Sequence, residues 1–416
     1  MEQWAQVNNL IITREQSNYD GTPCAVKVAC TVWIGGKGRD NVKALPIDIT
    51  IVVGSPGSGK TFALLNIAAN CLGMGQRVIA IDPKNDFDKL YNVNPSINII
   101  DINKIRPGAL NPFEFLKKID NKGKITFIDT ATLMTIIEIM CGKLDRNTII
   151  GITPIVTDFV TKCKTTGDYV DMQDVADYLY ANQNESAQTV GTMLKMFEDN
   201  KYGKLLFTRE TNVKPLVLSP TDSMVISLHG LSLPDYSKKP EDYDANERFT
   251  SAILYIITSK LMDILSGDNK VPTTLICDEA HLLFGNKEMG SIIDRFLVLG
   301  RSLNVATVLA SQGISHFPDG IANYITTKFM FKSSMEEAQL FLDKFDTSKI
   351  NPSSAIDVES IVSSATNFPT GTCFMIDRLN RNGIIRIKSI YDISLLTSNP
   401  FAKKRDEEAE DEDDIN

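Results

Sequence analysis

The chain has 416 residues, of which 43% are hydrophobic and 23% are charged, and its net charge is −9. These values are typical of a globular protein with two to three structural units. No apolar run is long enough to cross a bilayer, and the start lacks the basic-then-apolar order of a signal peptide. We therefore expect a cytoplasmic protein without a transmembrane segment. The seven scattered cysteines indicate neither a disulfide framework nor a zinc site.

Residues 1–45 contain the alternating segment AVKVACTVWIGG, which is typical of a strand near the edge of the core. The first part of the core, residues 46–122, begins with IVVGSPGSGKTFALL at residues 51–65 and continues with the strand RVIAIDP. The first of these segments fits G-x-x-x-x-G-K-[ST], with a buried strand before the loop and a helix after it. Backbone N–H groups in such a loop and the N-terminus of the following helix bind phosphate.

The loop therefore predicts a nucleoside triphosphate site, with ATP and Mg²⁺ as the expected cofactors. Lys60 would reach the β- and γ-phosphates, and the hydroxyl of Thr61 would be a ligand of Mg²⁺. The residues expected to surround the phosphates are Gly54, Ser55, Pro56, Gly57, Ser58, Gly59, Lys60 and Thr61.

Residues 123–204 are expected to form an all-helical subdomain that is inserted into the α/β core. Helical spacing of apolar residues predicts three amphipathic helices, marked by Leu133, Ile136, Ile137 and Met140, by Ile152, Ile155, Val156 and Phe159, and by Val190, Met193, Leu194 and Phe197. The segment DMQDVADYL predicts a fourth helix. Packing is the default role of such helices, and contact with a partner is the alternative.

The second part of the core, residues 205–400, contains TTLICDEAHLLF at residues 273–284. An aspartate at the end of a central strand beside a phosphate loop holds Mg²⁺ through water, and a neighbouring glutamate orients the water that attacks the γ-phosphate. We therefore expect Asp278 to serve the metal and Glu279 to be catalytic. The alternative is a strand that simply reaches the surface. Farther on, Asn382-Gly383 between two strand-like runs predicts a hairpin.

Two further polar residues are catalytic candidates. Gln312 closes the strand VATVLASQ, where its side chain would reach the γ-phosphate; the alternatives are a local hydrogen bond, or Ser311 in its place if the register shifts by one. Arg301 is the best candidate for a guanidinium that spreads the transition-state charge; Arg295, Arg378 and Arg381 are further candidates, and a surface charge is the alternative. His281 is expected to be packed or hydrogen-bonded.

The negative charge of the chain is concentrated in its last residues. In KKRDEEAEDEDDIN, residues 403–416, three basic and eight acidic side chains sum to −5, which leaves −4 for the other 402 residues. We expect residues 401–416 to be an acidic disordered tail, with docking on a basic partner as the alternative.

The order of GSPGSGKT, IDPKNDF, LNPFEF, LICDEAHLL and GRSLNVATVLASQ resembles the VirB/TraC-type ATPases of conjugation and type IV secretion, in the HerA and FtsK branch of RecA-like motors. The likeness covers roughly residues 45–395. It implies a RecA-like P-loop fold with a mostly parallel central sheet. It also matches Asp82 to an acidic family position, for which a turn cap is the alternative. Family members carry a sizeable domain before the motor, so we expect the chain to correspond to the C-terminal motor half, with a short relative of the family as the alternative.

The resemblance implies an ATPase that forms a hexamer with copies of itself and powers assembly or substrate transfer by a conjugation or secretion apparatus, peripherally at the inner membrane. A DNA translocase of the HerA or coupling-protein type, with DNA as its substrate, is the first alternative. An ATP-binding scaffold with incidental turnover is the second. The carboxylate of Glu279 argues against the scaffold, because a scaffold has no need to orient water.

Overall fold

The structure is a computed structural model, and it describes residues 49–119, 125–208, 213–235, 238–267, 271–284, 287–345, 358–378, 381–389 and 391–397. The predicted edge strand within residues 1–45 and the predicted acidic tail, residues 401–416, lie outside the described residues.

A nine-stranded sheet forms the centre of the described part of the chain, in the order β11-β10-β9-β1-β8-β7-β2-β6-β3. The seven strands from β9 to β3 are parallel, and β10 and β11 run antiparallel at one edge. This confirms the predicted mostly parallel sheet. The strands are β1 (Ile49–Val53), β2 (Arg77–Asp82), β3 (Asn98–Asp101), β6 (Met224–Ser227), β7 (Thr273–Asp278), β8 (Val305–Ser311), β9 (Thr327–Met330), β10 (Thr372–Ile376) and β11 (Asn382–Arg386).

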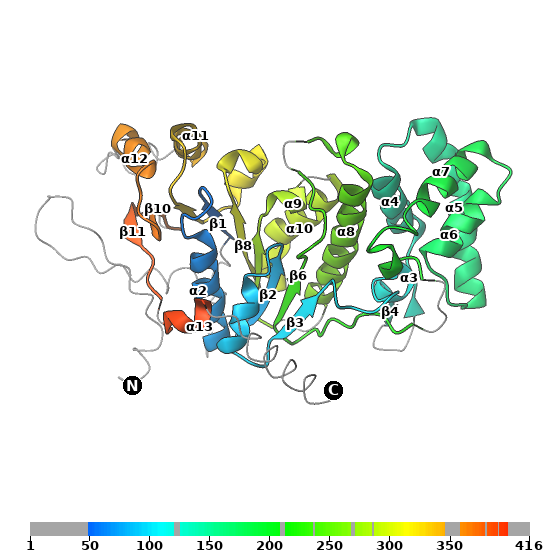
Figure 1. Cartoon of the computed structure of the whole chain (residues 1–416), viewed down its shortest axis with the longest axis horizontal. Coiled ribbons are helices and arrows are strands. Elements are labelled where there is room, and N and C mark those ends of the chain that lie inside the picture. Colours follow the sequence, from blue (N-terminus) through cyan, green and yellow to red (C-terminus); the bar gives the residue numbers. More distant parts are fainter. Residues whose placement is uncertain are drawn as a thin grey trace, which may run out of the picture.

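Both faces of the central strands are buried, which explains why the strands read as continuous apolar runs. In β2, Ile79 and Ile81 belong to the core cluster that includes α8 (Ala245–Leu265), whereas Val78 and Ala80 pack with α2 (Lys60–Gly73) on the other face. Figure 1 shows the helices on the two sides of the sheet. The alternation of β2 side chains between two apolar layers therefore fixes the sheet between these helices.

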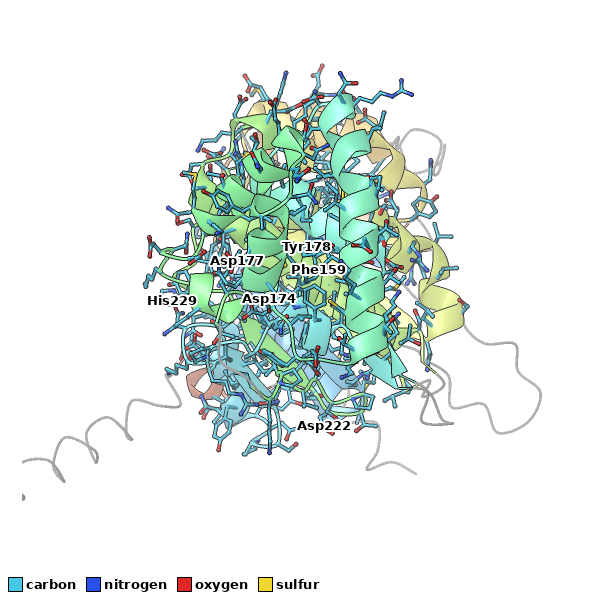
Figure 2. The ribbon with its side chains drawn as sticks, turned by 90° about the vertical axis from the view of Figure 1, so that its right-hand side faces the viewer. Phe159, Asp174, Asp177, Tyr178, Asp222 and His229 are labelled. Atoms are coloured by element: carbon cyan, nitrogen blue, oxygen red, sulfur yellow. The ribbon has the colours of Figure 1, made fainter. Side chains whose placement is uncertain are left out.

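Four helices lie within residues 123–204, the range of the predicted insertion, and Figure 1 shows them at the end of the sheet away from β11. They are α4 (Thr130–Cys141), α5 (Arg146–Thr166), α6 (Met172–Tyr180) and α7 (Glu185–Lys195). Leu133, Ile136 and Ile137, three of the apolar residues that predicted the first helix, are fully buried. Figure 2 shows this face of the molecule with Phe159 and Tyr178 labelled on it, and their ring centroids are 5.1 Å apart.

The remaining elements connect the sheet and the insertion. A short two-stranded sheet of β4 (Lys118–Ile119) and β5 (Ile125–Thr126) precedes α4. The other helices are α3 (Pro112–Phe115), α9 (His281–Phe284), α10 (Lys287–Leu303), α11 (Met335–Phe345), α12 (Val358–Ala365) and α13 (Ile393–Thr397). The 3₁₀ turns are η1 (Phe87–Asn92), η2 (Gly203–Leu205), η3 (Pro240–Asp242), η4 (Ile314–His316) and η5 (Asp319–Asn323). No helix among the described residues combines the length and the hydropathy needed to cross a membrane.

The C-terminal hairpin is present, but its turn is not at Asn382-Gly383 as expected. Both residues belong to β11 and pair with Ile376 and Met375 of β10. The connection runs from Asp377 to Arg381, where the Asp377 carboxylate accepts a hydrogen bond from the backbone N–H of Arg381 at 2.8 Å. A side-chain carboxylate that closes a longer turn thus replaces the glycine-containing two-residue turn that the sequence pattern favoured.

One buried carboxylate joins the helical insertion to the segment that returns to the core. Asp171 caps α6 in a capping box with Asp174, and its second oxygen accepts from the backbone N–H of Thr208 at 3.0 Å. Asp171→Ala removes both contacts, so we expect a loss of about 1–3 kcal/mol in the free energy of unfolding. Urea denaturation monitored by circular dichroism measures it. Asp145→Ala is the matched control, because Asp145 is an exposed cap of α5 alone; equal losses in the two variants would contradict the account.

Candidate nucleotide-binding site

The ends of three neighbouring strands bring the predicted site residues together. In the register of the sheet, Val53 of β1 lies beside Ser311 of β8, and Ala310 lies beside Asp278 of β7. The carboxyl ends of parallel strands share one edge of the sheet, which is where ligands bind in open α/β folds. The loop after β1, the Asp-Glu pair after β7 and the residue after β8 therefore meet at this edge.

The loop between β1 and α2 depends on glycines at two positions. Gly54 has φ +154°, and a Cβ there would lie 2.7 Å from the Cβ of Phe331. Gly59 has φ +105°, and its Cβ would lie 2.8 Å from the backbone nitrogen of Gly371. Both glycines thus allow an unusual backbone conformation and a close approach by another segment.

Two segments that are distant in the sequence brace this loop. The backbone N–H of Ser55 donates to the carbonyl of Lys332 at 2.7 Å, just after β9. The N–H of Gly371, just before β10, donates to the carbonyl of Ser58 at 2.9 Å. The loop is therefore held by the segments that follow β9 and precede β10, and the sequence pattern of the loop itself gave no sign of this.

Lys60 lies in the first turn of α2 and is only 7% exposed. Its Nζ donates hydrogen bonds to the carbonyl oxygens of Gly54 at 2.5 Å and of Ser55 at 3.1 Å. Burial lowers the pKa of Lys60, although the nearby negative charges of Asp278 and Glu279 oppose this shift. The ammonium is thus placed under the loop, on the side of the two carboxylates.

Asp278 and Thr61 are in direct contact beside the phosphate loop. The Thr61 hydroxyl donates to Oδ2 of Asp278 at 3.1 Å. The other oxygen, Oδ1, is buried and has no hydrogen-bond partner among the described residues. Burial raises the pKa of Asp278. A buried carboxylate oxygen without a partner, beside a hydroxyl, fits the oxygen ligands that Mg²⁺ prefers, so these residues fit the predicted metal.

Glu279 sits at a strained position immediately after β7. Its φ is +88°, a value that non-glycine residues rarely adopt. The backbone N–H groups of Glu279 and Ala280 both donate to the carbonyl of Ala310, at 3.1 and 2.6 Å. These two bonds to the neighbouring strand hold the sharp turn that aims the Glu279 side chain into the site.

Three side chains surround the Glu279 carboxylate. Lys84 forms an ion pair with Oε1, the Gln312 amide donates to the same oxygen at 3.4 Å, and Nδ1 of His281 lies 3.4 Å from Oε2. Burial alone would raise the pKa of Glu279, but the hydrogen bonds from His281 and Lys84 outweigh it and hold the pKa at about 2. The carboxylate is therefore ionised at neutral pH. His281 is packed, as expected, with its ring centroid 5.5 Å from that of His316. The hydroxyl of Ser311 forms a hydrogen bond with Nδ1 of His316 at 2.7 Å.

Lys84 is the residue of this cluster that sequence reasoning missed. It lies in IDPKNDF, two positions after the end of β2, and β2 is the strand beside β7. The sequence feature that could have indicated Lys84 is a lysine two positions after the acidic residue that ends a strand. Asp82 itself is buried and accepts from the backbone N–H of Lys84 at 3.1 Å and of Phe87 at 2.8 Å. Asp82 thus caps the turn that presents Lys84, and burial raises its pKa to about 6.

Arg301 is not near the phosphate loop of its own chain. It lies in the last turn of α10, and α10 leads directly into β8 at Val305. The seven residues of β8 span roughly 20 Å before Gln312 is reached. The backbone of Arg301 is therefore beside the amino end of β8, whereas the other candidate residues are at its carboxyl end.

The close approach at Gly59 makes a specific prediction about the loop. Gly59→Ala combines an unfavourable φ with a backbone clash against Gly371, so we expect a loss of about 2–4 kcal/mol in the free energy of unfolding and weaker nucleotide binding. Gly57→Ala is the matched control, because Gly57 has φ +73° but nothing within 4 Å of its Cβ; we expect a loss of about 1 kcal/mol. Chemical denaturation and fluorescent-nucleotide titration compare the two. Indistinguishable variants would show that the contact with Gly371 does not brace the loop.

Comparison with solved structures finds the same fold. VirB4 of Thermoanaerobacter pseudethanolicus aligns with a TM-score of 0.65 and 14% identity, over 93% of this chain and 98% of that chain. The bacterial conjugative coupling protein TrwBdeltaN70 aligns with a TM-score of 0.47 and 13% identity, over 82% of this chain and 85% of that chain. The likeness to VirB4 shows that the two proteins share a fold.

Comparison with sequences gives the family. Among curated proteins no significant match is found. A family model described as an AAA-like domain matches residues 42–398, which is most of the chain. Together with a phosphate loop, an Asp-Glu pair and a glutamine at one edge of a parallel sheet, this match leads to one conclusion: the protein belongs to the AAA-like domain family of P-loop NTPases.

Proposed function

We propose that the protein is the ATP-hydrolysing motor of a conjugation or type IV secretion apparatus. The proposal of ATP hydrolysis is based on the convergence of Lys60, Asp278 and Glu279 at one edge of the sheet. The assignment to conjugation draws support from the shared fold with VirB4 over nearly the full length of both chains. The motif order across residues 45–395 points to the same group of motors.

Each residue has a distinct role in this proposal. Residues 54–61 surround the phosphates, and Lys60 neutralises charge at the β- and γ-phosphates. Thr61 and Asp278 hold Mg²⁺, which supplies charge stabilisation on the transferred phosphoryl group. Glu279 orients and polarises the attacking water, because its carboxylate is ionised at neutral pH and lies beside the phosphate loop. Gln312, which donates to Glu279, keeps that carboxylate in position and senses the γ-phosphate.

The position of Arg301 supports a motor that works as a ring. The backbone of Arg301 lies beside the amino end of β8, away from the phosphate loop of its own subunit, which fits a role at the phosphate loop of a neighbour. We propose a hexamer in which Arg301 enters the next subunit's site and spreads the transition-state charge. The ring would act in the cytoplasm, peripherally at the membrane-embedded machinery.

Replacing the proposed catalytic carboxylate tests the hydrolytic role. Glu279→Gln keeps the volume of the side chain but removes its charge, so we expect retained binding of ATP and Mg²⁺ and a turnover reduced about 100-fold or more. A phosphate-release assay measures the turnover, and a fluorescent ATP analogue measures binding. Glu336→Gln, at an exposed carboxylate in the first turn of α11, is the control and should behave as wild type. A Glu279→Gln variant with full turnover would contradict the assignment of Glu279 as the catalytic carboxylate.

Mixing two inactive variants tests the ring. Arg301→Ala should bind ATP but turn it over slowly, because its contribution to the neighbouring site is lost. Combined with Glu279→Gln, it should restore part of the activity, since a mixed interface then carries both native groups. Phosphate release measured against the mixing ratio reports the effect. Two variants that stay inactive in every mixture, or an Arg301→Ala variant of normal rate, would show that the site is complete within one subunit.

A further inference from the structure

Lys84 is a second cation in the candidate site, placed there by a rigid turn. Asp82 accepts the backbone N–H of Lys84 at 3.1 Å. The following residue, Asn85, has φ +62°, and its Oδ1 accepts the hydroxyl of Ser227, on the next strand, at 3.0 Å. The backbone of Lys84 is therefore fixed from both sides, whereas its side chain remains 48% exposed.

The Glu279 carboxylate, which pairs with the ammonium of Lys84, also has two other neighbouring side chains. Lys84 pairs with Oε1 of Glu279, which also accepts from Gln312 at 3.4 Å, and the other oxygen lies 3.4 Å from His281. The Glu279 side chain is only 4% exposed. Gln312 and His281 thus remain beside the Glu279 carboxylate when the ammonium turns away from it. Lys84 is the more exposed member of the pair.

The same ammonium lies on the side of the site where the terminal phosphate belongs. Its charge acts on Lys60, whose pKa it helps to lower, and on the buried carboxylate of Asp278. A water held by Glu279 attacks the γ-phosphorus, so the terminal phosphate of a bound triphosphate lies one water molecule from the carboxylate that Lys84 contacts. A diphosphate ends short of this point. The γ-phosphate is therefore the second anion within reach of Lys84.

We propose that the ammonium of Lys84 is shared between Glu279 and the terminal phosphate of a bound nucleoside triphosphate, so that Lys84 contacts the substrate and distinguishes a triphosphate from a diphosphate. This inference rests on the proposed function of the site. When the ammonium turns to the γ-phosphate, Oε1 of Glu279 is freed to accept a hydrogen bond from the attacking water. The exchange couples recognition of the triphosphate to activation of the water.

The test is a comparison of affinities that requires no turnover. The full-length chain is titrated with a fluorescent non-hydrolysable ATP analogue and with fluorescent ADP, both in the presence of Mg²⁺. Lys84→Ala should weaken binding of the triphosphate about tenfold or more and change binding of ADP less than about twofold, because only the triphosphate carries the lost charge-assisted contact. Lys84→Arg, which keeps the charge, should recover most of the triphosphate affinity.

Lys89→Ala is the matched control, because Lys89 belongs to the same segment and pairs with Asp86 at 3.0 Å instead of with Glu279. It should leave both affinities unchanged. Equal weakening of triphosphate and diphosphate in Lys84→Ala, unchanged binding of both, or no recovery in Lys84→Arg would overturn the proposal while leaving the proposed function standing. A wild-type chain that binds neither nucleotide would overturn both.

Discussion

Two adjacent carboxylates, Asp278 and Glu279, are buried at the end of a central strand, and much of the site compensates for that burial. Buried charge is costly unless it is paired and hydrogen-bonded. Lys84, Gln312 and His281 provide the pairing for Glu279, whereas Asp278 has the Thr61 hydroxyl on one oxygen and no partner among the described residues on the other. A divalent cation bound at this oxygen would compensate the negative charge of Asp278.

The strand order explains how these groups meet, and the bracing of the phosphate loop explains why they keep their places. Because β8 lies between β1 and β7, the loop and the carboxylate pair face each other across one strand. The turn at Glu279 is closed on Ala310 of that strand. The loop forms hydrogen bonds with residues that follow β9 and precede β10, so this end of the sheet supports the site without supplying any of its candidate chemical groups.

Local patterns in the sequence were sufficient for the loop, the Asp-Glu strand, the strand before Gln312 and the four inserted helices, because each has a spacing that reflects its own packing. Contacts between segments that are distant in the sequence could not be predicted from these local patterns. The position of β9 beside β1, the close approach of Gly371 to Gly59 and the pairing of Lys84 with Glu279 all depend on the order of strands in the sheet. The hairpin turn was misplaced because the carboxylate of Asp377, and not Gly383, closes it.

In the proposed ring each site is incomplete within one subunit, since the backbone of Arg301 lies at the opposite end of β8 from the other candidate residues. Imaging of particles formed by the full-length chain with Mg²⁺ and a non-hydrolysable ATP analogue tests this most directly. The account predicts closed six-membered rings in which Arg301 of one subunit faces the phosphate loop of the next. Particles that remain monomeric at saturating nucleotide, or rings in which Arg301 faces away from every phosphate loop, would contradict it.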